Sequence, residues 1–161
     1  MLITFLRHAT AEDRNLATAD AERALTEKGE KQMKRLAAFC QEKQLLPASL
    51  YTSPILRARQ TAQILHSRLP ACPAPLIADW LGFDTSPQLI VGKLAELSAH
   101  GADNVWLVGH EPDFSETIAQ LLHTSAEHFI IKKASLSHLD ADFGSQPKAA
   151  LLWSIPCALM T

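Results

Sequence analysis

The sequence predicts an α/β fold, a three-layer α/β/α sandwich built on a mostly parallel sheet. Short apolar runs that are typical of buried strands alternate with longer segments in which apolar residues recur at helical spacing. This alternation favours parallel strands joined by helices that cover both faces of the sheet. Near the C-terminus, two apolar runs flank the turn-forming stretch Gly144–Pro147, which predicts an antiparallel hairpin at the end of the sheet.

The first strand is predicted over Leu2–Leu6, where five mostly apolar residues open the chain and run straight into Arg7 and His8. A run this short is typical of a buried strand rather than a helix. The clearest later strand is Asn104–Val108. The remaining candidate strands are Ser49–Pro54 (ending in a turn), Pro75–Ala78, Phe129–Ile131, Ala134–Leu139 and Ala150–Ile155.

A helix is predicted to begin after Thr26, whose hydroxyl suits an N-cap, with acidic side chains in the first turn where the helix dipole favours them. Its apolar positions recur at helical spacing and predict a core face, and Pro47 marks the limit of the helix. These core positions are Met33, Leu36, Ala37 and Cys40. Further helices are predicted over Arg57–Leu65 and Leu89–Ala99 and after Pro112, whose missing N–H is no loss in a first turn.

Length and composition predict a single domain over residues 1–161. The net charge of −2, without a long run of one sign, argues against nucleic acid or an anionic membrane as the main partner. Cys40, Cys72 and Cys157 have no metal-ligand spacing, and free thiols are typical of a reducing compartment. No apolar run approaches the ~18 residues of a membrane span, so we expect a cytoplasmic protein.

Charged or titratable side chains follow three of the predicted strands. Arg7 and His8 follow the first strand, Arg57 follows the second, and His110 follows Asn104–Val108. Ligands of open α/β sheets bind beyond the carboxyl ends of the strands, so neighbouring strands would bring these side chains to one spot. Arginines and histidines there suit an anionic ligand. The alternative for the first pair is chance: a solvated arginine and a histidine that caps a loop.

Four motifs occur in the order and approximate spacing of a known family. They are Leu6-Arg7-His8-Ala9, Leu25-Thr26-x-x-Gly29, Ser53-Pro54-x-x-Arg57-Ala58-x-Gln60-Thr61 and Gly109-His110-Glu111-Pro112. The chain thereby resembles the histidine phosphatase superfamily, which has the phosphoglycerate-mutase-like fold. Within that superfamily it is most similar to the short SixA-type branch, the phosphohistidine phosphatases. The resemblance extends over essentially the whole chain.

The resemblance implies a role for each matching residue. His8 matches the nucleophile that becomes phosphorylated, Arg7 and Arg57 match the arginines that clamp the phosphate, and His110 matches the second histidine. Glu111 is assigned to the same phosphate site, either to orient a pocket residue or to face a helix dipole. The backbone N–H groups of the helix after His110 are expected to add an anion site. No metal or other cofactor is implied, since arginines supply the positive charge, and a cation held by the two histidines would be repelled by them.

The expected function is a metal-independent phosphatase that acts on phosphohistidine in a protein, through a phosphohistidine intermediate on His8. A small-molecule phosphomonoesterase or mutase of the same fold and a non-catalytic phosphoprotein-binding module remain alternatives.

No residue clearly matches the acid of the larger family members: Asp79 and Asp84 lie in the right region, but we favour a loop role for both. Few residues separate Leu65 from Asn104, which predicts an open pocket without a capping subdomain. The charges of the Thr10–Ala24 loop are expected to form a solvated face.

Overall fold

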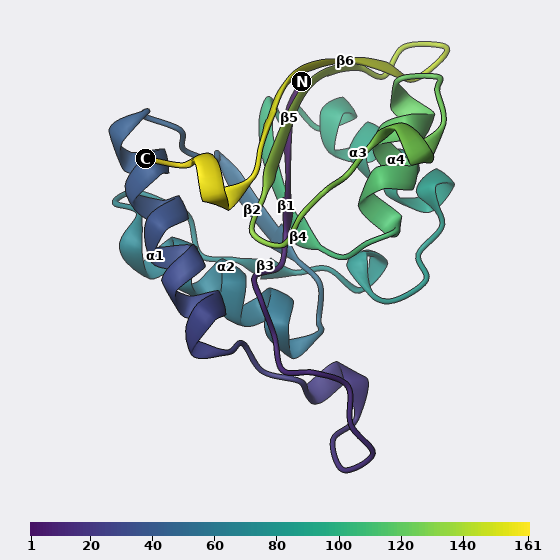
Figure 1. The fold of residues 1–161 in the computed structure, drawn as a ribbon. Helices are drawn as coiled ribbons and strands as arrows, with labels where there is room; N and C mark the ends of the chain where they lie inside the picture. Colours follow the sequence, from purple (N-terminus) through teal and green to yellow (C-terminus); the bar gives the residue numbers. More distant parts are fainter.

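The computed structural model describes residues 1–161 and contains a six-stranded mixed sheet with the strand order β3-β2-β4-β1-β5-β6 (Figure 1). The first four strands in that order are parallel, while β5 pairs antiparallel with β1 and β6 pairs antiparallel with β5. The predicted parallel sheet with a C-terminal antiparallel hairpin is therefore confirmed. The strands are β1 (Leu2–Arg7), β2 (Ser49–Thr52), β3 (Leu76–Ile77), β4 (Asn104–Gly109), β5 (Leu136–Asp142) and β6 (Lys148–Ile155).

Four helices cover the two faces of this sheet. In Figure 1 the helices α1 and α2 lie on one side of the strands, and α3 and α4 lie on the other. The helices are α1 (Glu27–Glu42), α2 (Leu56–Arg68), α3 (Pro87–Ala99) and α4 (Asp113–Leu121). None of them combines the length and the apolar character that crossing a bilayer requires.

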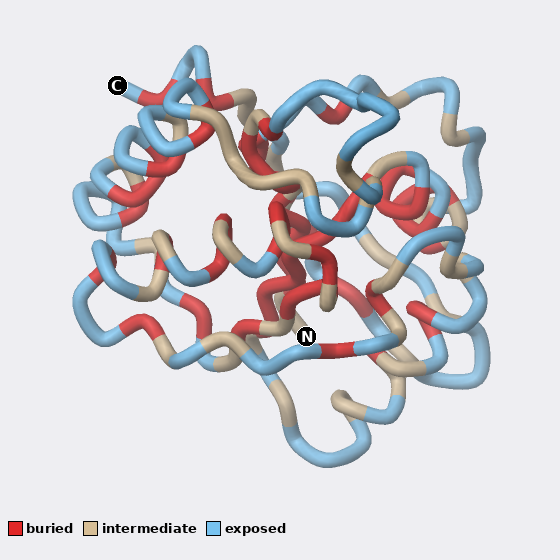
Figure 2. The backbone as a smooth tube through the Cα atoms, turned by 90° about the horizontal axis from the view of Figure 1, so that it is seen from below, coloured by how far each residue is buried: buried red, intermediate tan, exposed pale blue.

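The central strand β4 divides its side chains between two apolar cores. Trp106 and Val108 belong to the core under α1 and α2, whereas Val105 and Leu107 belong to the core under α3 and α4. This division follows from the two-residue period of a strand, which sends successive side chains to opposite faces. Figure 2 shows the result: buried residues concentrate along the central strands and on the inner sides of the helices.

The helix α1 begins as its sequence predicts. The Thr26 side chain accepts a hydrogen bond from the Gly29 backbone N–H at 3.2 Å, which satisfies one of the free donors of the first turn. The predicted apolar stripe of Met33, Leu36, Ala37 and Cys40 is buried against the sheet. The helix ends at Glu42, before Pro47.

The predicted strand over Phe129–Ile131 is wrong. A short 3-10 turn over Ala126–His128 leads into irregular backbone, and Ile130 is 86 % exposed while Ile131 is buried. The carbonyl of Ile131 accepts a hydrogen bond from the Arg7 side chain instead of pairing with a strand. An apolar run of three residues is too short to indicate a strand by itself. Here a distant side chain also occupies the backbone carbonyl that a neighbouring strand would need.

The register of the sheet aligns the carboxyl ends of its central strands. Arg7 of β1 lies beside Gly109 of β4, and Thr52 of β2 lies beside Val108. The residues that follow these positions, which include His8, Ser53 and His110, therefore emerge at the same edge of the sheet.

Candidate active site

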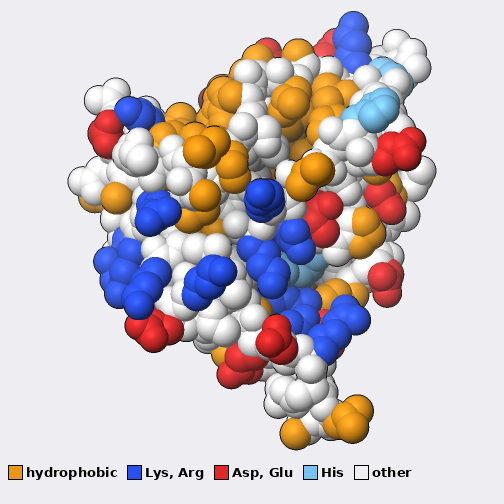
Figure 3. All heavy atoms as spheres, in the orientation of Figure 1, with side chains coloured by type: hydrophobic (Ala, Val, Ile, Leu, Met, Phe, Trp, Pro, Cys, Tyr) orange, Lys and Arg blue, Asp and Glu red, His pale blue; other side chains and the backbone are white.

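One pocket at this edge collects every side chain that the sequence assigned to the site. Arg7, His8, Arg57, His110 and Glu111 all line a cavity of about 250 Å³. Figure 3 shows Lys and Arg side chains gathered around a histidine on one face of the molecule. The other lining residues are Arg14, Arg23, Phe83, Asp84, Pro112, Asp113 and Lys133.

The imidazole of His8 is held in one tautomer. Its Nδ1 lies 2.7 Å from the carbonyl oxygen of Ala9, and because a carbonyl only accepts, Nδ1 carries the proton. Nε2 therefore carries no proton, and its lone pair accepts a hydrogen bond from Nε of Arg57 at 3.3 Å. Burial lowers the pKa of His8 to about 3, and the nearby Arg57 charge adds to this effect. His8 is thus a neutral imidazole with an unprotonated Nε2 at neutral pH.

The guanidinium of Arg57 is fixed by a loop that sequence analysis had assigned to solvent. Its Nη1 donates to the backbone carbonyl of Asp20 at 2.7 Å, and its Nη2 donates to the Asp20 carboxylate at 3.1 Å. The ring of Phe83 lies over the same guanidinium, 5.1 Å from its carbon. Burial lowers the pKa of Arg57, while Asp20 opposes that effect. These contacts hold the plane of the side chain against His8.

Arg7 reaches the pocket from the last residue of β1. Its Nη1 donates to the carbonyl of Ile131 at 2.7 Å, and its Nε is buried without a hydrogen-bond partner. Burial lowers the pKa of Arg7, and the Glu111 carboxylate raises it. One end of the guanidinium is therefore anchored, while other N–H donors remain for an anion.

His110 lies opposite His8, with 5.2 Å between the two ring centroids. Its Nε2 lies 2.8 Å from the hydroxyl oxygen of Ser53, and its Nδ1 is buried without a partner. Burial lowers the pKa of His110 to about 4, and the Arg57 charge contributes. A dianion bound in the pocket would raise the pKa of His110 again, because a negative charge nearby favours the protonated imidazole.

The start of α4 offers fewer backbone donors than the sequence predicted. The Phe114 N–H donates to the carbonyl of His110 at 3.1 Å, and the Ser115 N–H donates to the Glu111 carboxylate at 3.1 Å. Two of the first N–H groups are therefore satisfied within the chain. Glu111 acts here as a side-chain cap, with its pKa raised by burial and lowered by Ser115 and Arg7.

A cluster of arginines surrounds Asp20 and was not predicted from the sequence. The Asp20 carboxylate accepts from Arg23 at 2.7 Å and from Arg14 at 3.1 Å, in addition to Arg57. Burial alone would raise the pKa of Asp20, but Arg23 and Arg57 hold it below its ordinary value. Expecting a solvated face was wrong for this part of the loop, because Arg23 is 12 % exposed and lines the pocket. The available signal was the mixed charge of one short loop, in which Arg14 and Arg23 lie among four acidic residues.

Carboxyl groups line the side of the pocket next to α4. Asp84 lies there, as does Asp113, whereas Asp79 is not among the lining residues. Burial raises the pKa of Asp113 to about 6; the Thr85 backbone lowers it, and the Asp84 charge raises it. Sequence analysis did not single out Asp113, although its place three residues after His110 marks it as a candidate.

Comparison with known proteins places this pocket in a family. A model of the histidine phosphatase superfamily (branch 1) matches residues 3–80. This match includes the segments that carry Arg7, His8 and Arg57. The chain belongs to the histidine phosphatase superfamily. A relative from Picosynechococcus sp. strain PCC 7002, an uncharacterized protein, is 34 % identical over 137 residues, which cover 84 % of this chain and 82 % of the relative.

Solved structures of two phosphatases share the fold. The protein histidine phosphatase SixA complexed with tungstate superposes with a TM-score of 0.89 at 19 % identity and covers all of both chains. A mycobacterial glucosyl-3-phosphoglycerate phosphatase in complex with VO3 gives a TM-score of 0.75 at 19 % identity, over 94 % of this chain and 97 % of that one. The fold is therefore the phosphoglycerate-mutase-like fold of SixA.

Proposed function

We propose that this histidine phosphatase hydrolyses phosphohistidine on a protein through a covalent intermediate on His8. The observation that carries the proposal is the state of His8: a neutral imidazole whose Nε2 faces the Arg57 guanidinium inside a cationic pocket. An unprotonated nitrogen is the nucleophile that phosphoryl transfer to histidine requires. Positively charged donors beside it stabilise the negative charge on the phosphoryl group as it is transferred.

The first half of the reaction is transfer of the phosphoryl group to the enzyme. Nε2 of His8 attacks phosphorus, the bond from phosphorus to the substrate imidazole breaks, and the leaving nitrogen takes a proton. Arg7 and Arg57 donate to the phosphoryl oxygens, and each charge pair at ~4 Å contributes about 4 kcal/mol at an effective dielectric constant of ~20, before desolvation. The Nδ1–H of His8 keeps its bond to the Ala9 carbonyl, which stabilises the positive charge that forms on the ring.

The second half of the reaction releases phosphate. Water attacks phosphorus and passes a proton to the Asp113 carboxylate, which lost one in the first half; the bond to Nε2 breaks, and His8 returns to its neutral form. His110 supports both steps by donating to the same oxygens once the bound dianion favours its protonated form. Glu111 orients the site by capping α4 beside Arg7 rather than by touching the phosphate, since two anions repel.

Asp113 is the proton source that we assign to the leaving imidazole. It is buried in the pocket wall, next to Asp84. Burial raises its pKa to about 6, so a useful fraction is protonated near neutral pH. The pocket thus has a cationic half for the phosphoryl group and an acidic half for the leaving group.

The segment between α2 and β4 supports a protein substrate. It contains β3, a short 3-10 turn and α3, and it contributes only Phe83 and Asp84 to the pocket lining. A pocket without a capping subdomain admits a phosphoryl group that is attached to a large surface. The SixA structure, which has the same short fold, is that of a protein histidine phosphatase.

A small-molecule phosphomonoesterase is the second candidate, because the mycobacterial relative in fold is a glucosyl-3-phosphoglycerate phosphatase. Turnover of a phosphohistidine protein, a phosphoserine peptide and a panel of sugar phosphates separates the two. We expect the phosphohistidine protein to be preferred, and a His8→Asn variant to lose turnover of every substrate. Efficient hydrolysis of sugar phosphates alone would contradict the proposal. Equal binding of phosphoprotein by wild type and variant, without turnover by either, would favour a binding module.

A further inference from the structure

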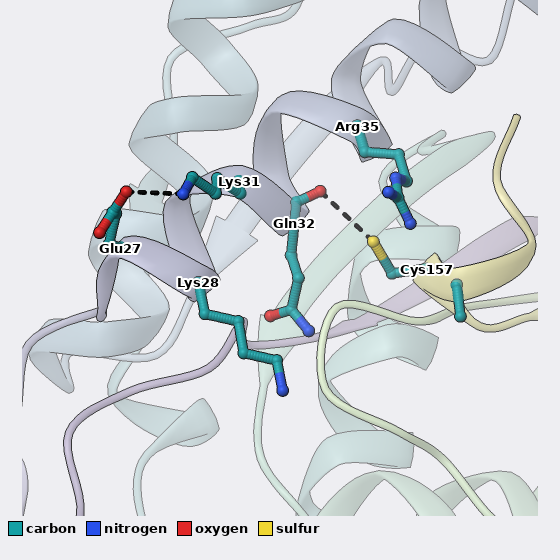
Figure 4. Close-up of a pocket in the computed structure, with 7 residues that line it drawn as sticks. Glu27, Lys28, Lys31, Gln32, Arg35 and Cys157 are labelled. Carbon is teal, nitrogen blue, oxygen red and sulfur yellow. Dashed lines mark hydrogen bonds and ion pairs between the residues drawn. The ribbon is translucent and has the colours of Figure 1, made fainter.

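A second cationic surface lies on α1, outside the active-site pocket. Lys28, Lys31 and Arg35 are spaced three and four residues apart, so they lie on one face of the helix. Together with Gln32 they line a hollow of about 520 Å³ that Cys157 and Ala158 close from the C-terminal segment. Figure 4 shows Lys28 and Arg35 on either side of Gln32, with Cys157 beside Arg35. Lys28, Lys31, Gln32 and Arg35 are called the α1 basic face below.

The charge of this face is not neutralised within the chain. Lys31 pairs with Glu27 at 2.6 Å, and both side chains are well exposed. Lys28 and Arg35 form no ion pair. Glu27 is the one acid that lines the hollow, and since the whole chain carries a net charge of −2, the positive potential of Lys28 and Arg35 is a local feature.

The α1 basic face is fixed relative to the nucleophile. The Gln32 side chain accepts the backbone N–H of Thr10 at 2.9 Å, and the Thr26 N–H donates to the Thr10 carbonyl at 3.0 Å. Gly29 lies so close to Thr10 that a Cβ atom there would sit 2.1 Å from its carbonyl oxygen. Thr10 follows His8 by two residues, so helix and nucleophile cannot move independently.

Lys133 joins the α1 basic face to the pocket. It lines the pocket, and its pKa is lowered by partial burial and by the charges of Arg7 and Lys28. Figure 3 shows Lys and Arg side chains spread from the side occupied by α1 in Figure 1 to the histidine at the pocket. The pocket and the side of the molecule occupied by α1 therefore lie on the same face, with basic side chains between them.

We propose that the α1 basic face docks an acidic patch on the protein that carries the phosphohistidine. This inference rests on the proposed function and adds the chemistry of the partner surface. A free phosphate ester or phosphoramidate fills only the pocket, whereas a protein also covers the surface beside it. Charge complementarity of this kind raises association rates and fixes orientation, and salt weakens it. The net negative charge of the chain disfavours DNA or an anionic membrane as the occupant.

The test compares two charge-reversal variants of the full chain. Lys28→Glu/Arg35→Glu removes the unpaired cations and leaves Gln32 in place. Lys43→Glu/Arg68→Glu is the control for net charge: it makes the same change at Lys43, which follows the end of α1 and pairs with Glu42, and at Arg68, the last residue of α2. Each is assayed with free phosphohistidine, with a phosphohistidine protein that has acidic residues near its histidine, and with that protein after its acids are changed to amides.

We expect Lys28→Glu/Arg35→Glu to raise KM for the acidic protein about tenfold or more, with kcat and the turnover of free phosphohistidine unchanged. The KM of wild type should rise with salt and after neutralisation of the partner's acids, and the control variant should match wild type. Equal KM values for both variants and for both proteins would overturn the inference while leaving the proposed function intact. Wild type that hydrolyses none of the three phosphohistidine substrates would refute the proposed function and, with it, this inference. Loss of binding to duplex DNA or anionic vesicles, with the protein KM unchanged, would assign the face to those partners instead.

Discussion

A single backbone contact decides which nitrogen of His8 can react. The Ala9 carbonyl accepts from Nδ1, so the lone pair lies on Nε2, where Arg57 points. Arg57 is held in the same way: its Nε donates to His8, its Nη1 to the Asp20 backbone carbonyl and its Nη2 to the Asp20 carboxylate. The chemistry of the site therefore depends on the hydrogen bonds of His8 and Arg57, which residues of another type do not reproduce.

Arg57→Lys is expected to lower kcat/KM by about 10²-fold, because an ammonium group cannot replace the planar fork. Steady-state kinetics measure the loss, and a thermal melt checks that the variant is folded. Arg59→Lys, an exposed position on the same helix, is the control and should behave as wild type. Turnover by Arg57→Lys within twofold of wild type would remove Arg57 from the site.

Asp113→Asn tests the assigned proton source. The carboxyl group has its pKa raised to about 6 by burial, so its protonated form is lost as pH rises through that value. We expect the variant to lose about 10- to 100-fold in kcat near pH 5.5 and to show a flatter pH profile above it. Glu116→Gln, an exposed carboxyl in the same turn, should leave the profile unchanged. An unaltered profile in Asp113→Asn would give Asp113 a structural role only.

The two buried histidines also couple stability to pH. Burial lowers the pKa of His8 to about 3 and that of His110 to about 4, compared with 6.5 for a free histidine. Below pH 6.5 the unfolded chain binds protons that the folded chain does not, so stability is full above that value and is lost as pH falls toward 4. We expect the free energy of unfolding to fall by up to about 1.4 kcal/mol per histidine per pH unit across this window.

Urea unfolding of wild type and of His8→Gln/His110→Gln at pH 7 and pH 5 measures this coupling. The variant should lose clearly less free energy of unfolding between the two pH values than wild type does. The same loss in both proteins would mean that other groups govern the pH dependence.

At the scale of single elements, α1 contributes both to the core and to the position of His8. Its apolar stripe covers the sheet, and its first turn packs against Thr10, just after His8, the proposed nucleophile. Gly29 makes that close approach possible, since any side chain there meets backbone. The motif that contains Gly29 is thus explained by packing, with a direct consequence for the position of His8.

Gly29→Ala is expected to reduce the free energy of unfolding by about 1–3 kcal/mol through overpacking, despite the better helix propensity of alanine. Gly92→Ala in α3 is the control, because a Cβ there meets nothing within 4 Å. The control should gain up to about 1 kcal/mol from helix propensity. Chemical denaturation measures both, and a stabilised Gly29→Ala would contradict the packing argument.

The elements were largely predictable from sequence, because their signals are local. The Thr26 cap, the apolar stripe of α1 and the run Asn104–Val108 each specify an element through near neighbours. The core site residues could be located because three strand ends share one sheet edge. The contacts of Asp20 with Arg23 and the burial of Asp113 were not predicted, since they depend on how loops fold over the pocket, and the charged loop and the place of Asp113 after His110 were the only signals in the sequence.

At the scale of the whole molecule, charge is separated rather than spread. The chain has a net charge of −2, but basic side chains concentrate around the pocket and the α1 basic face, while carboxyl groups line the pocket wall near α4. The fold creates this pattern by bringing β1, the Asp20 loop, α2 and β4 to one edge of the sheet. In the proposed reaction, the phosphoryl group binds in the cationic half of the pocket and the leaving group lies in the acidic half.

The central claim is that His8 accepts the phosphoryl group on Nε2. Rapid quenching of the enzyme with a phosphohistidine substrate, followed by mass spectrometry and phosphorus NMR of the trapped protein, tests it most directly. We predict an acid-labile phosphate on Nε2 of His8 that forms and decays fast enough to account for turnover. A phosphorylated residue other than His8, or full turnover with no phosphoenzyme at any time, would contradict it.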